Sequence, residues 1–305
     1  MQGIDITPAE LVKQICSILG LGVPIWLWLA WRWRSKHTLL AFEPHRPVPW
    51  EGVDIVLVLA VFFLAEFFCG SIGLRLAGIT PSVEGHGVTS QEELAEFACD
   101  AVARLVTVLI GAAVIARRVQ ATKSDLGFDF SRPLYDVACG VIAFVAIAPI
   151  LYTIQIISQV FIVQYHHPLI DTVEKRPEAI SWLIVTVSAV FVAPLAEEFF
   201  FRVLLQGWLE KIERAWCEQK WDSALAPAGA APPGLLNLPL GTVPIIVTSE
   251  LFALTHSGQG AAPIPLFLLA LVLGFLYHRT HRLLPSVVVH FLLNGITIAM
   301  LFASK

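Results

Sequence analysis

The chain has 305 residues, of which 56% are hydrophobic and only 14% are charged. Soluble domains carry about 25% charged residues, so this composition excludes an ordinary water-soluble protein and indicates one that crosses a membrane several times. The formal net charge of −4 and the absence of a basic stripe in the sequence argue against a nucleic-acid partner.

Apolar segments follow one another along the whole chain and predict an all-α membrane bundle of about eight transmembrane helices. A spanning helix needs about 20 apolar residues, and most segments meet that length, although the seventh is short. We expect residues 1–305 to form a single membrane domain. The segments cover residues 8–31, 52–78, 94–116, 136–163, 180–208, 239–257, 263–279 and 284–303.

Lysine and arginine gather in every second connection between these segments. The connections after the first, third, fifth and seventh segments hold most of them, whereas the other connections hold only Lys175 and Arg176. Because basic loops stay in the cytoplasm, both termini of this multi-pass protein are predicted to lie outside the cytoplasm. The fifth connection, residues 218–238, is rich in alanine, glycine and proline and is predicted to be a flexible cytoplasmic loop.

The strongest signal for function is a charged group inside the fifth apolar segment. Glu197, Glu198 and Arg202 lie within six positions of a run that is otherwise suited to lipid. A charged residue at membrane depth costs at least a few kcal/mol and is a functional candidate by default. On a helix, Glu198 and Arg202 share a face and can pair, while Glu197 points about 100° away and stays available. Pro194 lacks an N–H and is expected to kink the helix beside them.

Two later segments carry polar residues of the same kind. His256 ends the sixth segment, and His290 and Asn294 are one helical turn apart on the eighth. Donors on one face of a helix can stabilise a developing oxyanion. Helical rise from Pro239 places His256 about 26 Å from the cytoplasmic face, deeper than Glu197, so we expect the sixth helix to begin within the cytosol.

In order, Glu197-Glu198-x-x-Phe201-Arg202, Phe252-x-x-x-His256 and His290-x-x-x-Asn294 resemble the motifs of the CPBP family. This family groups type II CAAX prenyl endopeptidases with Abi-type and bacteriocin-processing intramembrane proteases. The resemblance covers roughly residues 180–300, and we expect residues 180–303 to form the catalytic core.

The resemblance implies an intramembrane endopeptidase that hydrolyses a peptide bond with a glutamate-activated water. By position, Glu197 would be the base and His256 would help to hold the water. His290 and Asn294 would form the oxyanion hole, and Glu198 with Arg202 would fix the site. We expect no cofactor. Zinc is the alternative, because two histidines and a carboxylate can ligate it, but Asn294 would then have no role.

Other functions and residues stay open at this point. The substrate would be a membrane-associated peptide or protein, with CAAX-type processing of a lipidated C-terminus as one option. A non-proteolytic, Abi-like immunity or scaffold protein and a proton-coupled transporter are the alternatives. Among the other buried charges, Asp100 and Arg104 are expected to pair with each other, and Glu66 is expected either to line a cavity or to pair with Arg104.

Overall fold

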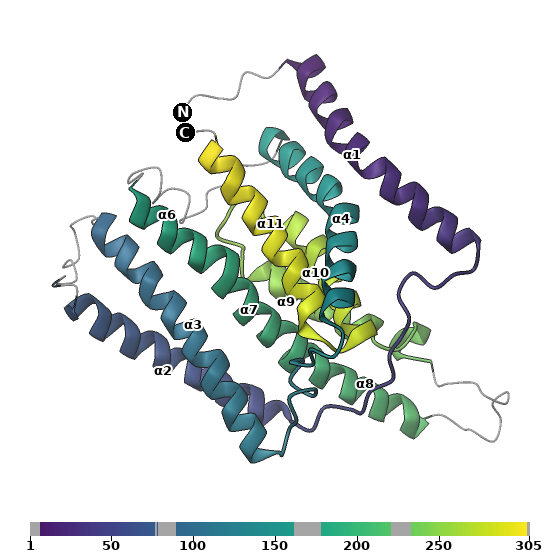
Figure 1. The fold of residues 1–305 in the computed structure, drawn as a ribbon. Coiled ribbons are helices and arrows are strands. Elements are labelled where there is room, and N and C mark those ends of the chain that lie inside the picture. Colours follow the sequence, from purple (N-terminus) through teal and green to yellow (C-terminus); the bar gives the residue numbers. More distant parts are fainter. Residues whose placement is uncertain (1–6, 77, 79–89, 162–177, 221–232, 304–305) are drawn as a thin grey trace.

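The computed structural model describes residues 7–76, 78, 90–161, 178–220 and 233–303. Helices make up most of this described part of the chain, and no strand occurs in it (Figure 1). Among the described residues, seven helices are long and apolar enough to cross a membrane, and α9 is a shorter apolar helix. The predicted helical, multi-pass membrane bundle is therefore confirmed. The first elements are α1 (Pro8–Arg34), α2 (Gly52–Leu76), α3 (Ser90–Arg118) and α4 (Pro133–Phe161), and the last are α9 (Thr242–Leu254), α10 (Pro263–Thr280) and α11 (Leu283–Ala303).

The fifth segment is one continuous helix that runs well past its predicted end at residue 208. It spans 42 residues, or about 63 Å, twice the hydrocarbon thickness of about 30 Å. The part of this helix after residue 208 is rich in charged residues, and for that reason the sequence pattern predicted a connection there. The helix consists of α6 (Ala179–Thr186), η1 (Val187–Val192), α7 (Ala193–Glu198), η2 (Phe199–Gln206) and α8 (Gly207–Lys220).

The predicted loop 218–238 begins later than expected, because α8 continues to Lys220. Residues 221–232 of that prediction lie outside the described residues. The chain then forms the short helical turn η3 (Leu235–Asn237) and is anchored to Glu213 of α8. The Glu213 carboxylate accepts hydrogen bonds from the backbone N–H groups of Leu235, at 3.1 Å, and Gly241, at 2.6 Å.

Helix α9 has 13 residues and is shorter than the predicted segment 239–257. Gly241, which precedes it, has φ +86°, a left-handed conformation that favours glycine. A Cβ at this position would lie 2.2 Å from the His278 ring, so a larger residue has no room. This turn delays the start of the helix to Thr242.

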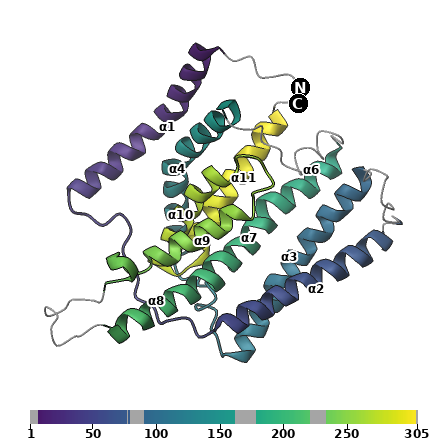
Figure 2. The same ribbon diagram turned by 180° about the vertical axis from the view of Figure 1, so that it is seen from behind.

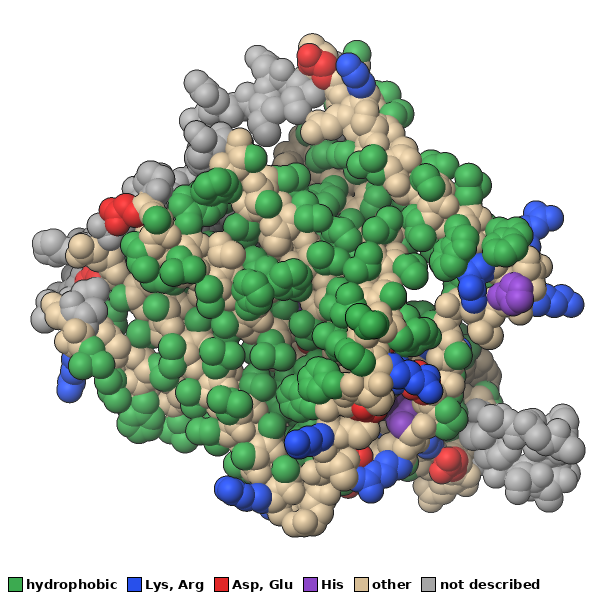
Figure 3. Space-filling view, viewed as in Figure 1, with side chains coloured by type: hydrophobic (Ala, Val, Ile, Leu, Met, Phe, Trp, Pro, Cys, Tyr) green, Lys and Arg blue, Asp and Glu red, His purple; other side chains and the backbone are tan. Residues whose placement is uncertain are grey.

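The helices form two groups that meet along the long fifth helix. Helices α2 and α3 make a hairpin that packs on one side of α6 and α7, while α4, α9, α10 and α11 gather on the other side (Figures 1 and 2). Helix α1 packs against α4 at the outer edge. Apolar side chains cover most of the visible face, and charged side chains collect at one end (Figure 3).

The charged end is where the basic connections meet, and buried ion pairs join them. Arg282, between α10 and α11, donates Nε to Asp136 of α4 at 2.8 Å and pairs through its other nitrogens with Glu43. The hydrogen bond from Arg282 lowers the pKa of Glu43 below the usual glutamate range. Its stabilising contribution is therefore complete at neutral pH and is lost as the pH falls through that lowered pKa.

We predict that Arg282→Met lowers the free energy of unfolding by about 3–5 kcal/mol, because it leaves the fully buried Asp136 carboxylate without a counter-charge. Denaturant unfolding of the protein in detergent micelles measures this loss. Arg46→Met is the control. It breaks the pair between Arg46 and Asp125, in which Arg46 is 61% exposed, and should cost much less. Equal losses in the two variants would contradict the prediction.

Candidate active site

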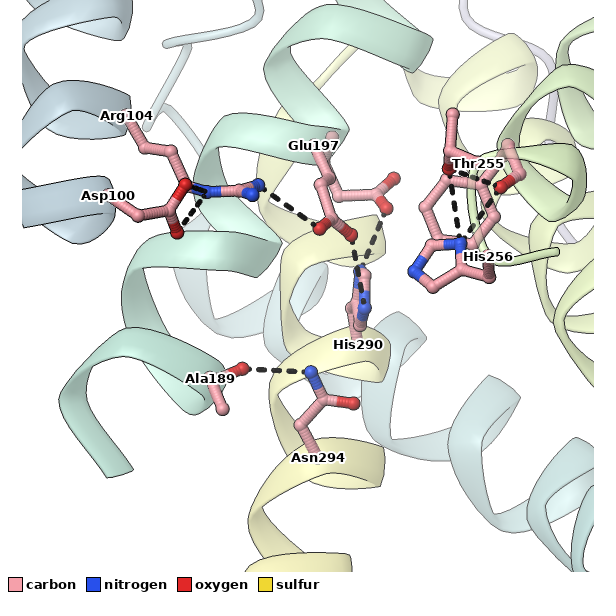
Figure 4. A network of polar contacts seen from close by, with 10 residues as sticks. Asp100, Arg104, Ala189, Glu197, Thr255, His256, His290 and Asn294 are labelled. Carbon is pink, nitrogen blue, oxygen red and sulfur yellow. Dashed lines mark hydrogen bonds and ion pairs between the residues drawn. The ribbon is translucent and has the colours of Figure 1, made fainter. Parts of the chain in front are cut away.

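A cavity of about 540 Å³ lies between the α2–α3 hairpin and the C-terminal helices. Four of the predicted site residues face it, and the close view shows them around a common space (Figure 4). The other two, Glu198 and Arg202, are fully buried behind its wall. Polar lining residues are Asp100, Arg104, Glu197, His256, His290 and Asn294, with Thr107, Ser188, Thr255 and Gln259.

Two π-helical turns, η1 and η2, flank the glutamate pair on the long helix. Such turns are rare and occur mostly at functional sites. In the wider register of η1, the N–H of Ala193 bonds the carbonyl of Ser188, five residues earlier. The next N–H in that register would bond the carbonyl of Ala189, but Pro194 has none. Asn294 of α11 donates its Nδ2 to this Ala189 carbonyl at 2.8 Å instead.

Glu198 is the centre of a buried polar network. Its side chain is completely inaccessible, and its two oxygens bond different helices. Arg202 Nε lies 3.1 Å from Oε2, so the predicted pairing of these two residues is present. His290 Nδ1 of α11 lies 3.0 Å from Oε1. A buried carboxylate is stable only when it is paired in this way, and the network therefore ties α11 to the long helix.

Arg202 connects the same network to α9. Its Nη1 donates to the hydroxyl of Thr248 at 3.4 Å, and its guanidinium lies 5.6 Å from the centre of the Phe252 ring. Phe252 is itself fully buried, and its ring contacts those of His256, at 5.0 Å, and His290, at 5.9 Å. The phenylalanine of the second motif is thus the packing centre that joins the three motifs.

Glu197 has a different environment from its neighbour. Its side chain is 18% exposed and lines the cavity. Oε1 lies 3.5 Å from Nη1 of Arg104, and Oε2 lies 3.8 Å from Nε2 of His290 (Figure 4). Arg104 is held in turn by Asp100, whose oxygens lie 2.8 and 2.9 Å from its Nε. The Glu197 carboxylate is oriented by long contacts and keeps a face toward the cavity.

His256 follows the end of α9 and faces the cavity from the side opposite Glu197 (Figure 4). Its Nδ1 lies 3.0 Å from the Phe252 carbonyl oxygen, which can only accept, so Nδ1 carries the hydrogen of this bond. The ring therefore keeps Nε2 as a hydrogen-bond acceptor. Counting helical rise from Pro239 placed His256 deeper in the membrane than Glu197. In the structure His256 nevertheless lies beside the other site residues, because the Phe252 ring contacts both His256 and His290.

Sequence reasoning missed the part that the first half of the chain plays in this site. The predicted pair of Asp100 and Arg104 is present, and Arg104 also reaches Glu197. The sequence did show Asp100 and Arg104 one turn apart in an apolar helix. Which residues these side chains face, however, depends on how the α2–α3 hairpin packs. Glu66 does not pair with Arg104 through its Oε1, which is buried without a hydrogen-bond partner.

We predict that Arg202→Met destabilises the fold by about 3–5 kcal/mol, because Glu198 would remain buried without its cation. Unfolding in detergent micelles gives the free-energy difference. Arg117→Met at the end of α3 is the matched control, since Arg117 is exposed and its loss should change stability little. An Arg202→Met variant as stable as this control would show that the buried pair does not hold the site together.

The segment that carries this site matches a known protein family. Residues 179–296 match the family model described as "Rce1-like: Type II CAAX prenyl endopeptidase Rce1-like". Searches of the curated proteins and of the solved structures found no match. The matched segment runs from α6 into α11 and contains all three motifs, whereas α2 and α3 lie before it. Residues 179–296 of this membrane protein are therefore similar to the Rce1-like type II CAAX prenyl endopeptidases.

Proposed function

We propose that the protein hydrolyses a peptide bond near the C-terminus of a prenylated, membrane-associated protein, with Glu197 activating the attacking water. The contrast between two adjacent carboxylates carries this proposal. Glu198 is sealed off and bonded by Arg202 and His290, whereas Glu197 reaches the cavity. Only a carboxylate that faces the cavity can take a proton from a water bound there.

His256 completes the water site. Its Nδ1–H is directed to the Phe252 carbonyl, so Nε2 can accept a hydrogen bond from a water that lies between His256 and Glu197. When the two hydrogens of one water point to Glu197 and to His256, the lone pairs of its oxygen point away from both residues. The scissile carbonyl would lie on that side. Positioning of this kind lowers the barrier because the reacting atoms are already aligned.

His290 and Asn294 stabilise the oxyanion in this mechanism. Because Nδ1 of His290 is turned to Glu198, donation to an oxyanion from Nε2 requires a ring that carries both protons, and Glu198 supplies the compensating negative charge. Asn294 uses one amide hydrogen on the Ala189 carbonyl. The second hydrogen of the same amide remains for the cavity, which Asn294 lines.

The water is activated without a metal ion in this proposal. A zinc site needs three ligand atoms around one point. Within the described residues, Glu197, His256 and His290 do not bring their donor atoms close enough together to form such a group. His290 also directs its two nitrogens toward two different carboxylates. The residues therefore fit general-base catalysis better than a zinc centre.

The cavity walls suit a lipidated substrate. Aromatic and aliphatic side chains line the cavity on the α2–α3 side and on η2, beside the polar groups: Val58, Leu59, Phe62, Phe97, Val108, Phe199, Phe200 and Phe201. An isoprenyl chain is fully apolar and gains from transfer to such a surface. A scaffold or a proton-coupled transporter explains neither this combination nor the endopeptidase family match.

We also propose the orientation with both termini outside the cytoplasm. The connections that carry most of the basic residues join at one end of the bundle, while α1 begins and α11 ends at the other (Figure 1). A reporter enzyme active only in the cytoplasm and fused to the C-terminus should stay inactive. An active fusion would show that the C-terminus lies in the cytoplasm and would contradict the proposed orientation.

We predict that Glu197→Gln lowers kcat by about 10²–10⁴-fold, the usual contribution of a general base, while the protein stays folded. Cleavage of a farnesylated CAAX peptide by the purified protein measures this. Glu250→Gln is the matched control, because Glu250 is an exposed carboxylate on α9 that does not line the cavity. Arg104→Met should reduce kcat less, since it only orients Glu197.

The same assay is run with a chelator and again after zinc is added back. Activity that persists with the chelator supports the metal-independent mechanism. Activity that the chelator removes and zinc restores, while the Tm of the protein stays unchanged, would contradict it, provided that Glu197→Gln still blocks cleavage. Full cleavage by Glu197→Gln would overturn the assignment of the base itself.

A further inference from the structure

A second group of ionisable side chains lies away from the cavity, where the connections between helices meet. It consists of His45 from the connection between α1 and α2, Glu210 of α8, and His281 at the end of α10. One ligand atom from each lies within 4.8 Å of the others. These residues come from three separate parts of the chain, and none of them lines the cavity described above.

Glu210 carries a buried charge in this group, because its side chain is only 8% exposed. Gln206 donates to Oε1 at 2.8 Å, and His278 Nδ1 lies 3.2 Å from the same oxygen. His281 Nε2 lies 3.3 Å from Oε2. Across the described residues, the ion pairs of Glu210 are with histidines and none is with lysine or arginine. A buried carboxylate requires a positive partner, and a neutral imidazole does not provide one.

The histidines present their nitrogens as metal ligands do. His45 Nδ1 lies 3.1 Å from the backbone carbonyl oxygen of Glu43. When Nδ1 donates its hydrogen to this oxygen, the lone pair of the neutral ring is on Nε2. A hydrogen bond of this kind commonly orients a metal-binding histidine. The rings of His45 and His281 stack at an angle of 24°, so the two imidazoles lie side by side next to Glu210. His281 has a left-handed backbone, φ 49°, because it is the C-cap that ends α10.

We propose that His45, Glu210 and His281 bind one zinc ion, with a water molecule as the fourth ligand. Two imidazoles and one carboxylate form a donor set that zinc prefers and that magnesium and calcium do not. Gln206 donates to the remaining oxygen of Glu210, and His278 lies beside it. Tetrahedral zinc with bonds of about 2.1 Å separates its ligand atoms by about 3.4 Å, so the cluster contracts slightly when it binds. The ion ties the α1–α2 connection, α8 and the end of α10 together.

The test uses the full chain, purified in detergent with a tag that contains no histidine. The protein is stripped with a chelator, dialysed, loaded with zinc chloride or cobalt chloride, and dialysed again. We expect about one zinc per chain by elemental analysis, the visible absorption of tetrahedral cobalt, and a higher Tm with zinc. His45→Ala and His281→Ala should each lose the bound metal, the cobalt spectrum and the rise in Tm.

Two control variants separate this site from zinc held by surface histidines and from zinc held in the cavity. His37→Ala removes an exposed histidine of the same connection and should bind zinc like the wild type. Glu197→Gln should also keep the metal, since Glu197 belongs to the cavity. Metal that is lost in Glu197→Gln but kept in His281→Ala would overturn the proposal. It would equally be overturned by wild-type protein that retains no zinc, or by binding and stabilisation that survive in both His45→Ala and His281→Ala. The proposed peptidase reaction can fail its own assay without affecting this result.

Discussion

The candidate active site depends on a single buried carboxylate. Glu198 has no contact with solvent, and a charge in such a place is stable only when cations and donors surround it. The chain supplies Arg202 from the next turn and His290 from α11. Arg202 then contacts Thr248 and Phe252 of α9. Satisfying one charge therefore fixes three helices relative to one another. Two of them carry Glu197 and His290, and His256 follows the end of the third. The arrangement of the reactive groups follows from the requirement to neutralise a residue that does not itself reach the cavity.

The helix that carries the glutamates is adapted to this role by its irregular hydrogen bonding. Pro194 was expected to kink this helix. The effect seen in the structure is on the backbone hydrogen bonds of η1, which join residues five positions apart. In this register the proline leaves the Ala189 carbonyl free, and Asn294 donates to it. A freed carbonyl in an apolar bundle needs a donor. Asn294 provides the donor for the Ala189 carbonyl that Pro194 leaves without one. The same bond anchors the Asn294 side chain at the edge of the cavity. Asn294 thus has a structural reason to be present, in addition to the role proposed for it in catalysis.

The sequence predicted the parts of this protein that follow local rules. Apolar length and composition predicted the helical membrane bundle, and a spacing of four residues predicted the pair of Glu198 and Arg202. The three motifs, in their order, predicted the family whose model residues 179–296 match. Features that depend on packing were missed. The contact of Arg104 with Glu197 requires the α2–α3 hairpin to lie against α7. The late start of α9 requires the left-handed backbone of Gly241 beneath the ring of His278, and neither neighbour is evident from the pattern of residues.

Different parts of the chain supply the reactive groups and much of the surface around them. The segment that matches the family contains Glu197, His256, His290 and Asn294. The wall that faces them includes Val58, Leu59 and Phe62 of α2 and Phe97 of α3, all of which precede that segment. Arg104 of α3, held by Asp100, also contacts Glu197 from outside it. The groups proposed for catalysis are confined to the positions that the buried Glu198 network allows, whereas the apolar wall is free of that constraint. Changes at the apolar positions of this wall can therefore alter which substrates fit the cavity, whereas changes at Arg104 would also disturb Glu197.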